Sequence, residues 1–304
     1  MEREMAVADF VSLVVYSLTF LLGLPSNLLV LAVYVRKACK RGATPCVVYA
    51  LNLCVSNLAL VAWLPVMALE TALQSWALPL PVCLVYSFFL FASLYGSCLF
   101  LAVTTVGRYL GTAFPISYKL YRSARLSCGV SAGLWALVLL HLGLGLAAEG
   151  GAFFTHSSPR SNESRTCFRD FTTEQHAVLL PLRLEMALLL FLLPLAVTAF
   201  CTLRCVVLVR RSCLPAGRKR RVVGVACATL AVFAVCYGPY NASHVVGFVE
   251  GCTVAWRKEA ILSSTCNVFL EPVVMLLLSP PRLPGLAGRL CGRAGHVKTV
   301  TTRT

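Results

Sequence analysis

Seven apolar runs, each long enough to cross a lipid bilayer as a helix, dominate this 304-residue chain. A helix that spans the hydrocarbon core needs about 20 mostly apolar residues. We predict helices because the edge of an open sheet cannot complete its hydrogen bonds in lipid. No repeat or long linker divides the chain, so we expect one all-α domain over residues 1–304 with a short tail at about 279–304. The runs cover residues 10–35, 47–73, 82–106, 126–148, 177–209, 222–249 and 259–278.

The composition agrees with lipid as the solvent for most of the chain. Hydrophobic residues make up 58% of it and charged residues 13%, and the mean hydropathy is +0.79. A typical soluble domain carries about 25% charged residues. This balance excludes a disordered chain and argues against a soluble enzyme.

The net charge of +15 follows a topological pattern. Most of the 27 Lys and Arg residues lie in segments 36–45, 107–125, 204–221 and 279–304, which contain no Asp or Glu. Loops rich in Lys and Arg stay in the cytoplasm. We therefore predict a cytoplasmic C-terminus and, because the number of spans is odd, an external N-terminus. The basic surface is expected to contact lipid headgroups rather than nucleic acid.

Three of the 15 cysteines, Cys83, Cys167 and Cys252, lie on the predicted outer side, where thiols oxidise. A bridge between Cys83 and Cys167 would hold the long loop before the fifth run over the bundle, and Cys252 would remain a free thiol. Asn162 begins a glycosylation triplet in the same loop, in agreement with this orientation. A second triplet, at Asn241, falls inside the sixth run and is interpreted as chance.

Residues typical of one receptor class occur in span after span. They are Asn27, Arg108 and Tyr109, Trp135, Pro194, the Cys-Tyr-Gly-Pro stretch at 236–239, and Pro272. Together with seven helices and a bridge from the third helix to the second outer loop, these residues resemble the G protein-coupled receptors. The resemblance implies a multi-pass receptor of the plasma membrane without a cofactor, whose partner is a heterotrimeric G protein.

Within that class the chain closely resembles the free fatty acid receptors. The stretches that carry the resemblance are residues 107–111, 113–115, 180–185, 238–244 and 256–258. Residues 182–185 and His244 look like the branch for short acids, whereas residues 135–144 and the short tail look more like the branch for longer acids. The resemblance implies a fatty acid carboxylate as the ligand, with short chains favoured and longer chains left open.

Two arginines are the candidates for holding that carboxylate. Arg183 lies in the outer part of the fifth run, and Arg257 lies at the outer entrance of the seventh. Charged side chains at membrane depth are costly and usually face the bundle interior or a partner. Two guanidiniums from different helices form a carboxylate clamp, because each presents a planar fork of donors. For Arg183 the alternatives are contact with lipid headgroups or an ion pair with Glu185, and the two-residue spacing of Arg183 and Glu185 disfavours that ion pair. For Arg257 the alternative is an ordinary cation at the end of a loop.

The resemblance places five further residues around the two arginines. His141, His244, Tyr95 and Tyr240 match the polar lining of the family's site. A lone histidine in an apolar run is more often structural, and either tyrosine could equally be a core aromatic with a tethered hydroxyl. Glu149 matches a position that pairs with an arginine when ligand is absent, and a solvated loop acid is an equal alternative.

The length of the acid sets how it would bind. A buried methylene contributes about 0.8 kcal/mol, so an acid of about two to four carbons binds mainly through its head, with an affinity on the order of millimolar. A longer tail needs an apolar channel between helices. The candidate walls of that channel are Phe91, Leu144, Leu146 and Leu188.

At the inner end, the resemblance assigns Arg108 and Tyr109 to activation and G protein contact. Gly107 stands where the superfamily usually has an acid, which predicts a looser inactive state and basal signalling. The superfamily usually has Asp in the middle of the second helix and Asn or Asp before the proline of the seventh. This chain has Asn57 and Glu271 at these positions, so the carboxylate lies on the seventh helix instead of the second. Glu271 is predicted to take over a sodium-linked role; a neutral, protonated Glu271 is the alternative, since burial favours the uncharged form.

The sequence bears on three alternative functions. A carboxylate transporter would also explain two arginines, but it predicts repeated halves, which the sequence lacks. A membrane enzyme is disfavoured because the spans contain no recognisable catalytic motif. A receptor for another small carboxylate, such as a hydroxy acid, stays open.

Overall fold

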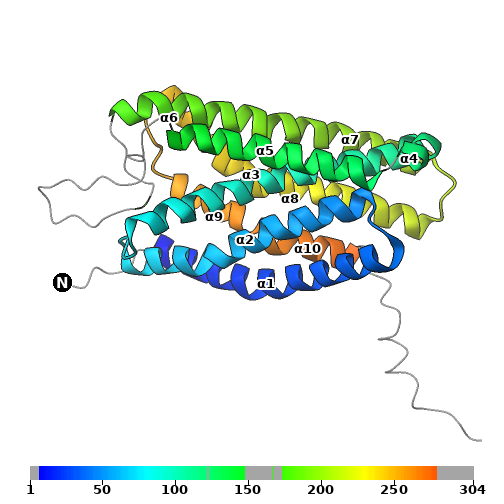
Figure 1. The fold of residues 1–304 in the computed structure, drawn as a ribbon, viewed down its shortest axis with the longest axis horizontal. Helices are drawn as coiled ribbons and strands as arrows, with labels where there is room; N and C mark the ends of the chain where they lie inside the picture. Colours follow the sequence, from blue (N-terminus) through cyan, green and yellow to red (C-terminus); the bar gives the residue numbers. More distant parts are fainter. Residues whose placement is uncertain (1–6, 122, 148–166, 168–172, 279–304) are drawn as a thin grey trace, which may run out of the picture.

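The computed structural model describes residues 7–121, 123–147, 167 and 173–278, and these form an elongated bundle of helices (Figure 1). Most of the helices run roughly along the long axis of the bundle. The elements are α1 (Val7–Arg41), α2 (Pro45–Leu73), α3 (Leu80–Ala113), α4 (Pro115–Tyr121), α5 (Ala124–Ala147), α6 (Thr173–Met186), the π-helix η2 (Ala187–Leu192), α7 (Leu193–Arg211), α8 (Ala216–Glu250), α9 (Arg257–Thr265) and α10 (Asn267–Leu278).

Six helical stretches of the described chain are long and apolar enough to cross a membrane. The seventh predicted run folds as two shorter helices, α9 with 9 residues and α10 with 12, which follow each other through Cys266. Neither helix alone reaches the roughly 20 residues of a spanning helix. The predicted all-α bundle is therefore confirmed, and its seventh crossing is a broken helix rather than a continuous one.

A proline explains part of the irregularity in this last crossing. Pro272 has no N–H, so it cannot bond to the carbonyl of Val268 one turn earlier. Asn27 of α1 satisfies that carbonyl instead: its Nδ2 donates to Val268 O at 2.7 Å and also to Gly23 O at 2.8 Å. This side chain is completely buried, so the bond also fixes α1 against α10.

The fifth predicted run consists of α6, η2 and α7 in unbroken succession. Pro194 is the second residue of α7, in its first turn after η2, and lacks the N–H that would continue the regular ladder. The six residues before α7 widen into a π-helix, a distortion that is rare and often occurs at functional sites. Arg183 lies one turn before this distortion.

Burial shows which helix lies at the centre of the bundle. In the most apolar stretch of α3, 72% of the residues are buried, against 28% in α1 and 17% in α5. The outer helices instead expose large apolar side chains, among them Phe10, Leu21, Leu140, Phe200 and Leu203. An apolar exterior is costly in water and suitable in hydrocarbon, which supports the prediction that the bundle lies in lipid.

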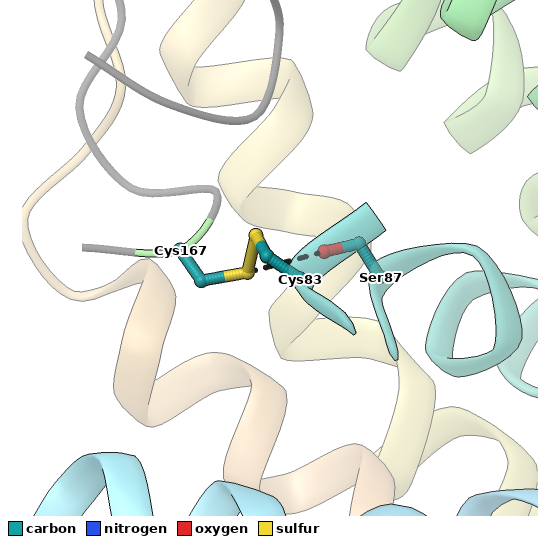
Figure 2. The surroundings of a disulfide bond; sticks show 3 residues. All are labelled: Cys83, Ser87 and Cys167. Carbon is teal, nitrogen blue, oxygen red and sulfur yellow. Dashed lines mark hydrogen bonds between the residues drawn. A yellow bond between two sulfur atoms is a disulfide. The ribbon is translucent and has the colours of Figure 1, made fainter. Parts of the chain in front are cut away.

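A disulfide closes one end of the bundle. Cys83, near the start of α3, is bonded to Cys167, as predicted, and Ser87 Oγ lies 3.6 Å from the sulfur of Cys167 (Figure 2). Cys252 is an exposed free thiol, also as predicted. We call the end of the bundle that holds this bridge the disulfide end. Asn162 and the tail at 279–304 lie outside the described residues.

The opposite end of the bundle is basic. There α1 and α7 end and α8 begins (Figure 1), and the last turn of α7 carries Arg210 and Arg211. Lys219 Nζ, in the first turns of α8, donates to the carbonyl of Arg210 at 3.0 Å and ties the two helices together. We call this the basic end.

Candidate functional site

Six of the seven residues predicted to bind the ligand line one cavity at the disulfide end. They come from five helices: Tyr95 from α3, His141 from α5, Arg183 from α6, Tyr240 and His244 from α8, and Arg257 from α9. The seventh, Glu149, lies outside the described residues. The cavity has a volume of about 60 Å³. We call it the inner cavity; its apolar wall includes Phe88, Phe91, Leu142, Leu179, Leu182 and Met186.

Arg257 is positioned by a tyrosine of the neighbouring helix. Its Nη2 donates to the hydroxyl of Tyr240 at 3.0 Å, and its guanidinium carbon lies 5.5 Å from the centre of the Tyr240 ring. Arg257 is 8% exposed and Tyr240 is 1% exposed, so this contact is shielded from solvent. Arg257 is therefore part of the buried wall, and the alternative of an ordinary loop-end cation is wrong.

Arg183 approaches the same cavity from α6. Its Nη1 donates to Thr253 Oγ1 at 3.1 Å, and His176 Nε2 lies 3.0 Å from the same hydroxyl. The side chain is 5% exposed, so it points into the bundle rather than out to headgroups. Two positive charges in one water-poor cavity repel each other, and an anion between them would relieve that repulsion.

Aromatic and imidazole rings form a continuous row beside the arginines. Tyr95 Oη lies 3.2 Å from His244 Nε2, and the His244 and Tyr240 rings meet edge to face at 4.5 Å. Tyr240 in turn is stacked on Phe91, with ring centres 6.1 Å apart. Each ring is restrained by its neighbour, so the row holds the Tyr240 hydroxyl in place for Arg257.

His141 and Glu185 connect the wall of the cavity to the outside of the bundle. His141 Nδ1 lies 2.7 Å from Leu137 O, and because a carbonyl only accepts, Nδ1 is the donor. His141 Nε2 lies 3.5 Å from Glu185 Oε1. Glu185 thus contacts α5 across the gap between helices, in agreement with the prediction that it would be a poor local partner for Arg183.

Two of the predicted channel walls do not line the inner cavity. Leu144 and Leu188 are 55% and 43% exposed and face away from the inner cavity, whereas Phe91 lines it. The reason is helical phase: on α5 the inward positions are 138, 141, 142 and 145, which the nearly uniform apolar sequence does not mark. The side chain of Leu146 lies outside the described ones. Thr253 was not predicted, because a threonine in a loop carries no sequence signal for contact with Arg183.

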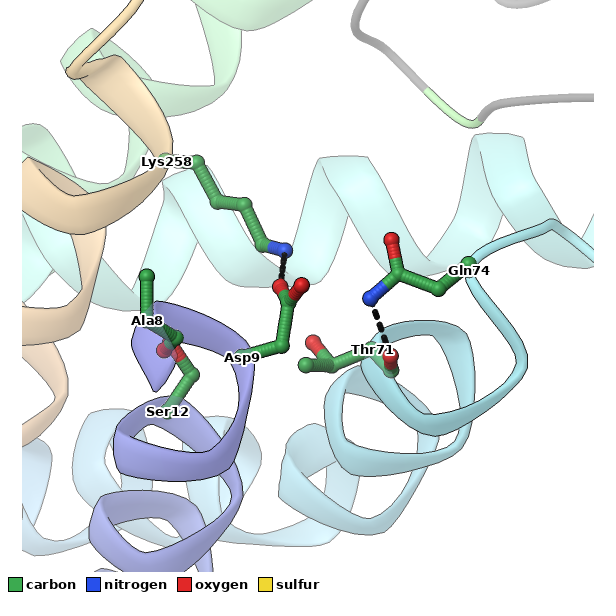
Figure 3. Close-up of polar contacts among 6 residues, drawn as sticks. All are labelled: Ala8, Asp9, Ser12, Thr71, Gln74 and Lys258. Atoms are coloured by element: carbon green, nitrogen blue, oxygen red, sulfur yellow. Dashed lines mark hydrogen bonds and ion pairs between the residues drawn. The ribbon is translucent and has the colours of Figure 1, made fainter. Parts of the chain in front are cut away.

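A second cavity, of about 500 Å³, lies nearer the disulfide end, and we call it the vestibule. It shares Ser87, Phe91 and Arg257 with the inner cavity. Lys258, in its wall, forms an ion pair with Asp9 of α1, and Gln74 Nε2 donates to Thr71 O nearby (Figure 3). The ion pair joins α1 to α9 next to Arg257. The sequence did not predict this cavity, because its walls come from helices far apart in the chain.

The residues predicted for activation lie toward the basic end. Arg108 Nη1 donates to Thr229 Oγ1 of α8 at 3.3 Å, so a hydroxyl holds it where the superfamily would use an acid. Tyr109 packs edge to face against Phe114 and Phe200. These contacts tie α3 to α7 and α8.

Asn57 and Glu271 meet between α2 and α10, as their predicted joint role requires. Both line a cavity of about 10 Å³ that Asn27 also borders. Asn57 Nδ2 donates to Asn27 Oδ1 at 3.3 Å, and Ser97 Oγ donates to Asn57 Oδ1 at 3.2 Å. Glu271 is 3% exposed. A cavity of this size has room for at most about one water molecule.

Six long apolar helices and a seventh, broken crossing enclose a cavity that holds two buried arginines beneath a disulfide, and this is the architecture of a seven-transmembrane receptor. Residues 26–275 match the model of the 7 transmembrane receptor (rhodopsin family), and the chain belongs to that family. It is therefore a multi-pass signalling receptor of the plasma membrane, not an enzyme or a transporter.

The chain is similar to receptors of two kinds. It is 39% identical to free fatty acid receptor 3 of Homo sapiens over 93% of this chain and 81% of that protein. It is 40% identical to free fatty acid receptor 1 of Mus musculus over 86% of this chain and 89% of that protein. It is also 39% identical to G-protein coupled receptor 42 of Homo sapiens, over 93% of this chain and 81% of that protein. The nearly equal identities confirm the predicted mixture of features.

Proposed function

We propose that this receptor is activated by free fatty acids and that a short-chain carboxylate is its preferred ligand. One observation carries the proposal: two buried guanidiniums from different helices, those of Arg183 and Arg257, line the same cavity. A carboxylate between them accepts hydrogen bonds from both forks and offsets both charges. The relatives named free fatty acid receptors support the same ligand class.

The size of the inner cavity supports a short acid. One water molecule needs about 10 to 15 Å³ of such space, so a cavity of about 60 Å³ has room for about four or five non-hydrogen atoms. Acetate and propionate are of that size. Because such an acid buries few methylenes, its head supplies most of the binding free energy, and we expect an affinity on the order of millimolar.

The remaining parts of the proposal concern orientation and coupling. The disulfide end faces outside, and the basic end faces the cytoplasm because Lys and Arg gather there. Glycosylation at Asn162, which lies outside the described residues, would agree with this orientation. Its cations attract the acidic headgroups of the inner leaflet. Arg108 and Tyr109 lie at the surface where a heterotrimeric G protein would bind.

Glu271 and Asn57 form the proposed sodium-linked site. They border one small cavity, and Asn27 adds an amide oxygen beside it. Oxygen atoms of this kind suit a hard cation. A sodium ion there would stabilise the inactive packing of α2 against α10, whereas a protonated Glu271 would make agonist affinity independent of sodium.

The proposed function is tested with acids from 2 to 18 carbons on cells that express the receptor, with G protein activation as the readout. We expect activation by acetate, propionate and butyrate. Arg183→Ala and Arg257→Ala should each abolish it while surface expression persists. Arg183→Lys is the matched control for charge: it keeps the cation without the planar fork, and its response should also fall. Activation that survives both alanine variants would refute the clamp, and a response to hydroxy acids alone would reassign the ligand.

A further inference from the structure

The inner cavity and the vestibule meet at three residues, and their sizes differ about eightfold. Ser87, Phe91 and Arg257 belong to the walls of both. We propose that the vestibule is the subsite for the acyl tail of acids longer than about four carbons, which bind with the carboxylate on the arginines. This inference rests on the proposed function and adds where a longer chain lies.

Phe91 is the partition between the two cavities. Its ring lies against Tyr240, nearly parallel, with centres 6.1 Å apart, and Tyr240 holds Arg257 through its hydroxyl. Ser87 lies one turn before Phe91 on α3, has a small side chain and is packed beside the disulfide (Figure 2). A chain that leaves the arginines toward the disulfide end therefore passes between the Phe91 ring and a small residue.

The vestibule offers such a chain enough apolar surface. The apolar and aromatic side chains in its wall are Tyr16, Met67, Tyr86, Leu90, Phe91, Val254 and Ile261. Each methylene that leaves water contributes about 0.8 kcal/mol, which corresponds to about a fourfold gain in affinity. Space of about 500 Å³ accommodates a medium or long tail, whereas the inner cavity does not.

The charges of the vestibule fix the direction of the acid. Glu70 and Glu259 line this cavity and repel a carboxylate, and Lys258 is already paired with Asp9 (Figure 3). The vestibule also has cationic or basic side chains in its wall, those of Arg257, Lys258 and His176, whereas the described wall of the inner cavity has Arg183 and Arg257 and no acid. The carboxylate is therefore favoured between Arg183 and Arg257, where two cations meet without a described acid beside them, and the tail extends toward the vestibule.

The first experiment measures the potency of octanoate relative to propionate in three variants. Phe91→Ala removes the partition and should raise that ratio about tenfold, because about two more methylenes become buried. Ala255→Trp fills the vestibule from an exposed loop position in its wall and should lower the ratio by a similar factor. Phe89→Ala, on the same helix but 44% exposed on the outer face, is the matched control and should leave the ratio unchanged. Equal ratios in all variants would overturn the inference.

The second experiment needs no substitution. Octanoic acid with a terminal alkyl diazirine is photolysed on the intact receptor, and the labelled residues are identified by mass spectrometry. Labelling of Met67, Leu90 or Ile261 supports the vestibule as the tail subsite. Labelling of Leu142 or Leu182 places the tail between α5 and α6 and overturns the inference. Equal potency ratios or labelling of Leu142 or Leu182, in a receptor that short acids still activate, would refute the tail subsite alone. If no acid activates the receptor, the proposed function and the tail subsite are both refuted.

Discussion

The contact between Arg257 and Tyr240 gives the most direct test of how the site is positioned. Tyr240→Phe removes only the hydroxyl that accepts the Arg257 Nη2 hydrogen bond at 3.0 Å. The ring remains, so the stacking on Phe91 and the contact of the guanidinium with the ring face are kept. Any change in potency then reports the lost hydrogen bond rather than a lost aromatic side chain.

The magnitude follows from the charge and burial of the pair. A hydrogen bond to a charged group contributes about 1.5–3 kcal/mol, and this one is shielded from solvent on both sides. We expect the potency of propionate to fall by about 10- to 150-fold, since about 1.4 kcal/mol corresponds to a factor of ten. Surface expression should stay near that of the wild type.

Tyr95→Phe is the matched comparison. It removes a hydroxyl whose partner, His244 Nε2, lies 3.2 Å away and belongs to an imidazole rather than a guanidinium. A neutral hydrogen bond contributes about 0.5–1.5 kcal/mol, so the loss should be about 2- to 12-fold. The measurement is a dose series of propionate with G protein activation. A Tyr240→Phe receptor with wild-type potency, or a larger loss in Tyr95→Phe, would refute the reasoning.

Three further outcomes are expected. Cys83→Ser opens a loop of about 84 residues, a loss of about 4–5 kcal/mol of chain-entropy stabilisation, so a flow-cytometry assay should find little receptor at the surface. Gly23→Ala should lower the midpoint of thermal unfolding in detergent, because the added carbon would lie 2.7 Å from the Val268 side chain of α10. Gly133→Ala is the matched control: there is open space around this glycine, so the same midpoint should stay the same or rise. Agonist affinity should fall as sodium is raised in the wild type, and this dependence should vanish in Glu271→Gln; a sodium-independent wild type would favour the protonated carboxyl.

Much of this architecture could be predicted because lipid restricts the backbone. An apolar run in hydrocarbon must satisfy its hydrogen bonds internally, so length and hydropathy were enough to locate the crossings. The break at Cys266 escaped prediction for two reasons. The residues around it, Ser263 to Asn267, include no Gly or Pro that would mark it. The compensating contact with Val268 O comes from Asn27, a residue 241 positions away.

Among the predicted site residues, Arg183 and Arg257 line one cavity, whereas of the predicted apolar residues Phe91 lines it and Leu144 and Leu188 do not. A buried arginine in an apolar run is rare and costly, so Arg183 was conspicuous in the sequence. Leu144 and Leu188 are exposed instead. Nearly every residue around them is apolar, so the sequence shows no periodicity that would mark which side of the helix is buried.

The sequence by itself determined the membrane crossings, the cysteines on the outer side and the charged residues that lie at membrane depth. These follow from the transfer of each residue between water and lipid, which is a local property. Only the tertiary structure decided that Tyr240 holds Arg257, that Thr253 holds Arg183, and that Phe91 lines two cavities. Those arrangements depend on the rotation and tilt of packed helices, which are fixed by contacts between residues far apart in the chain.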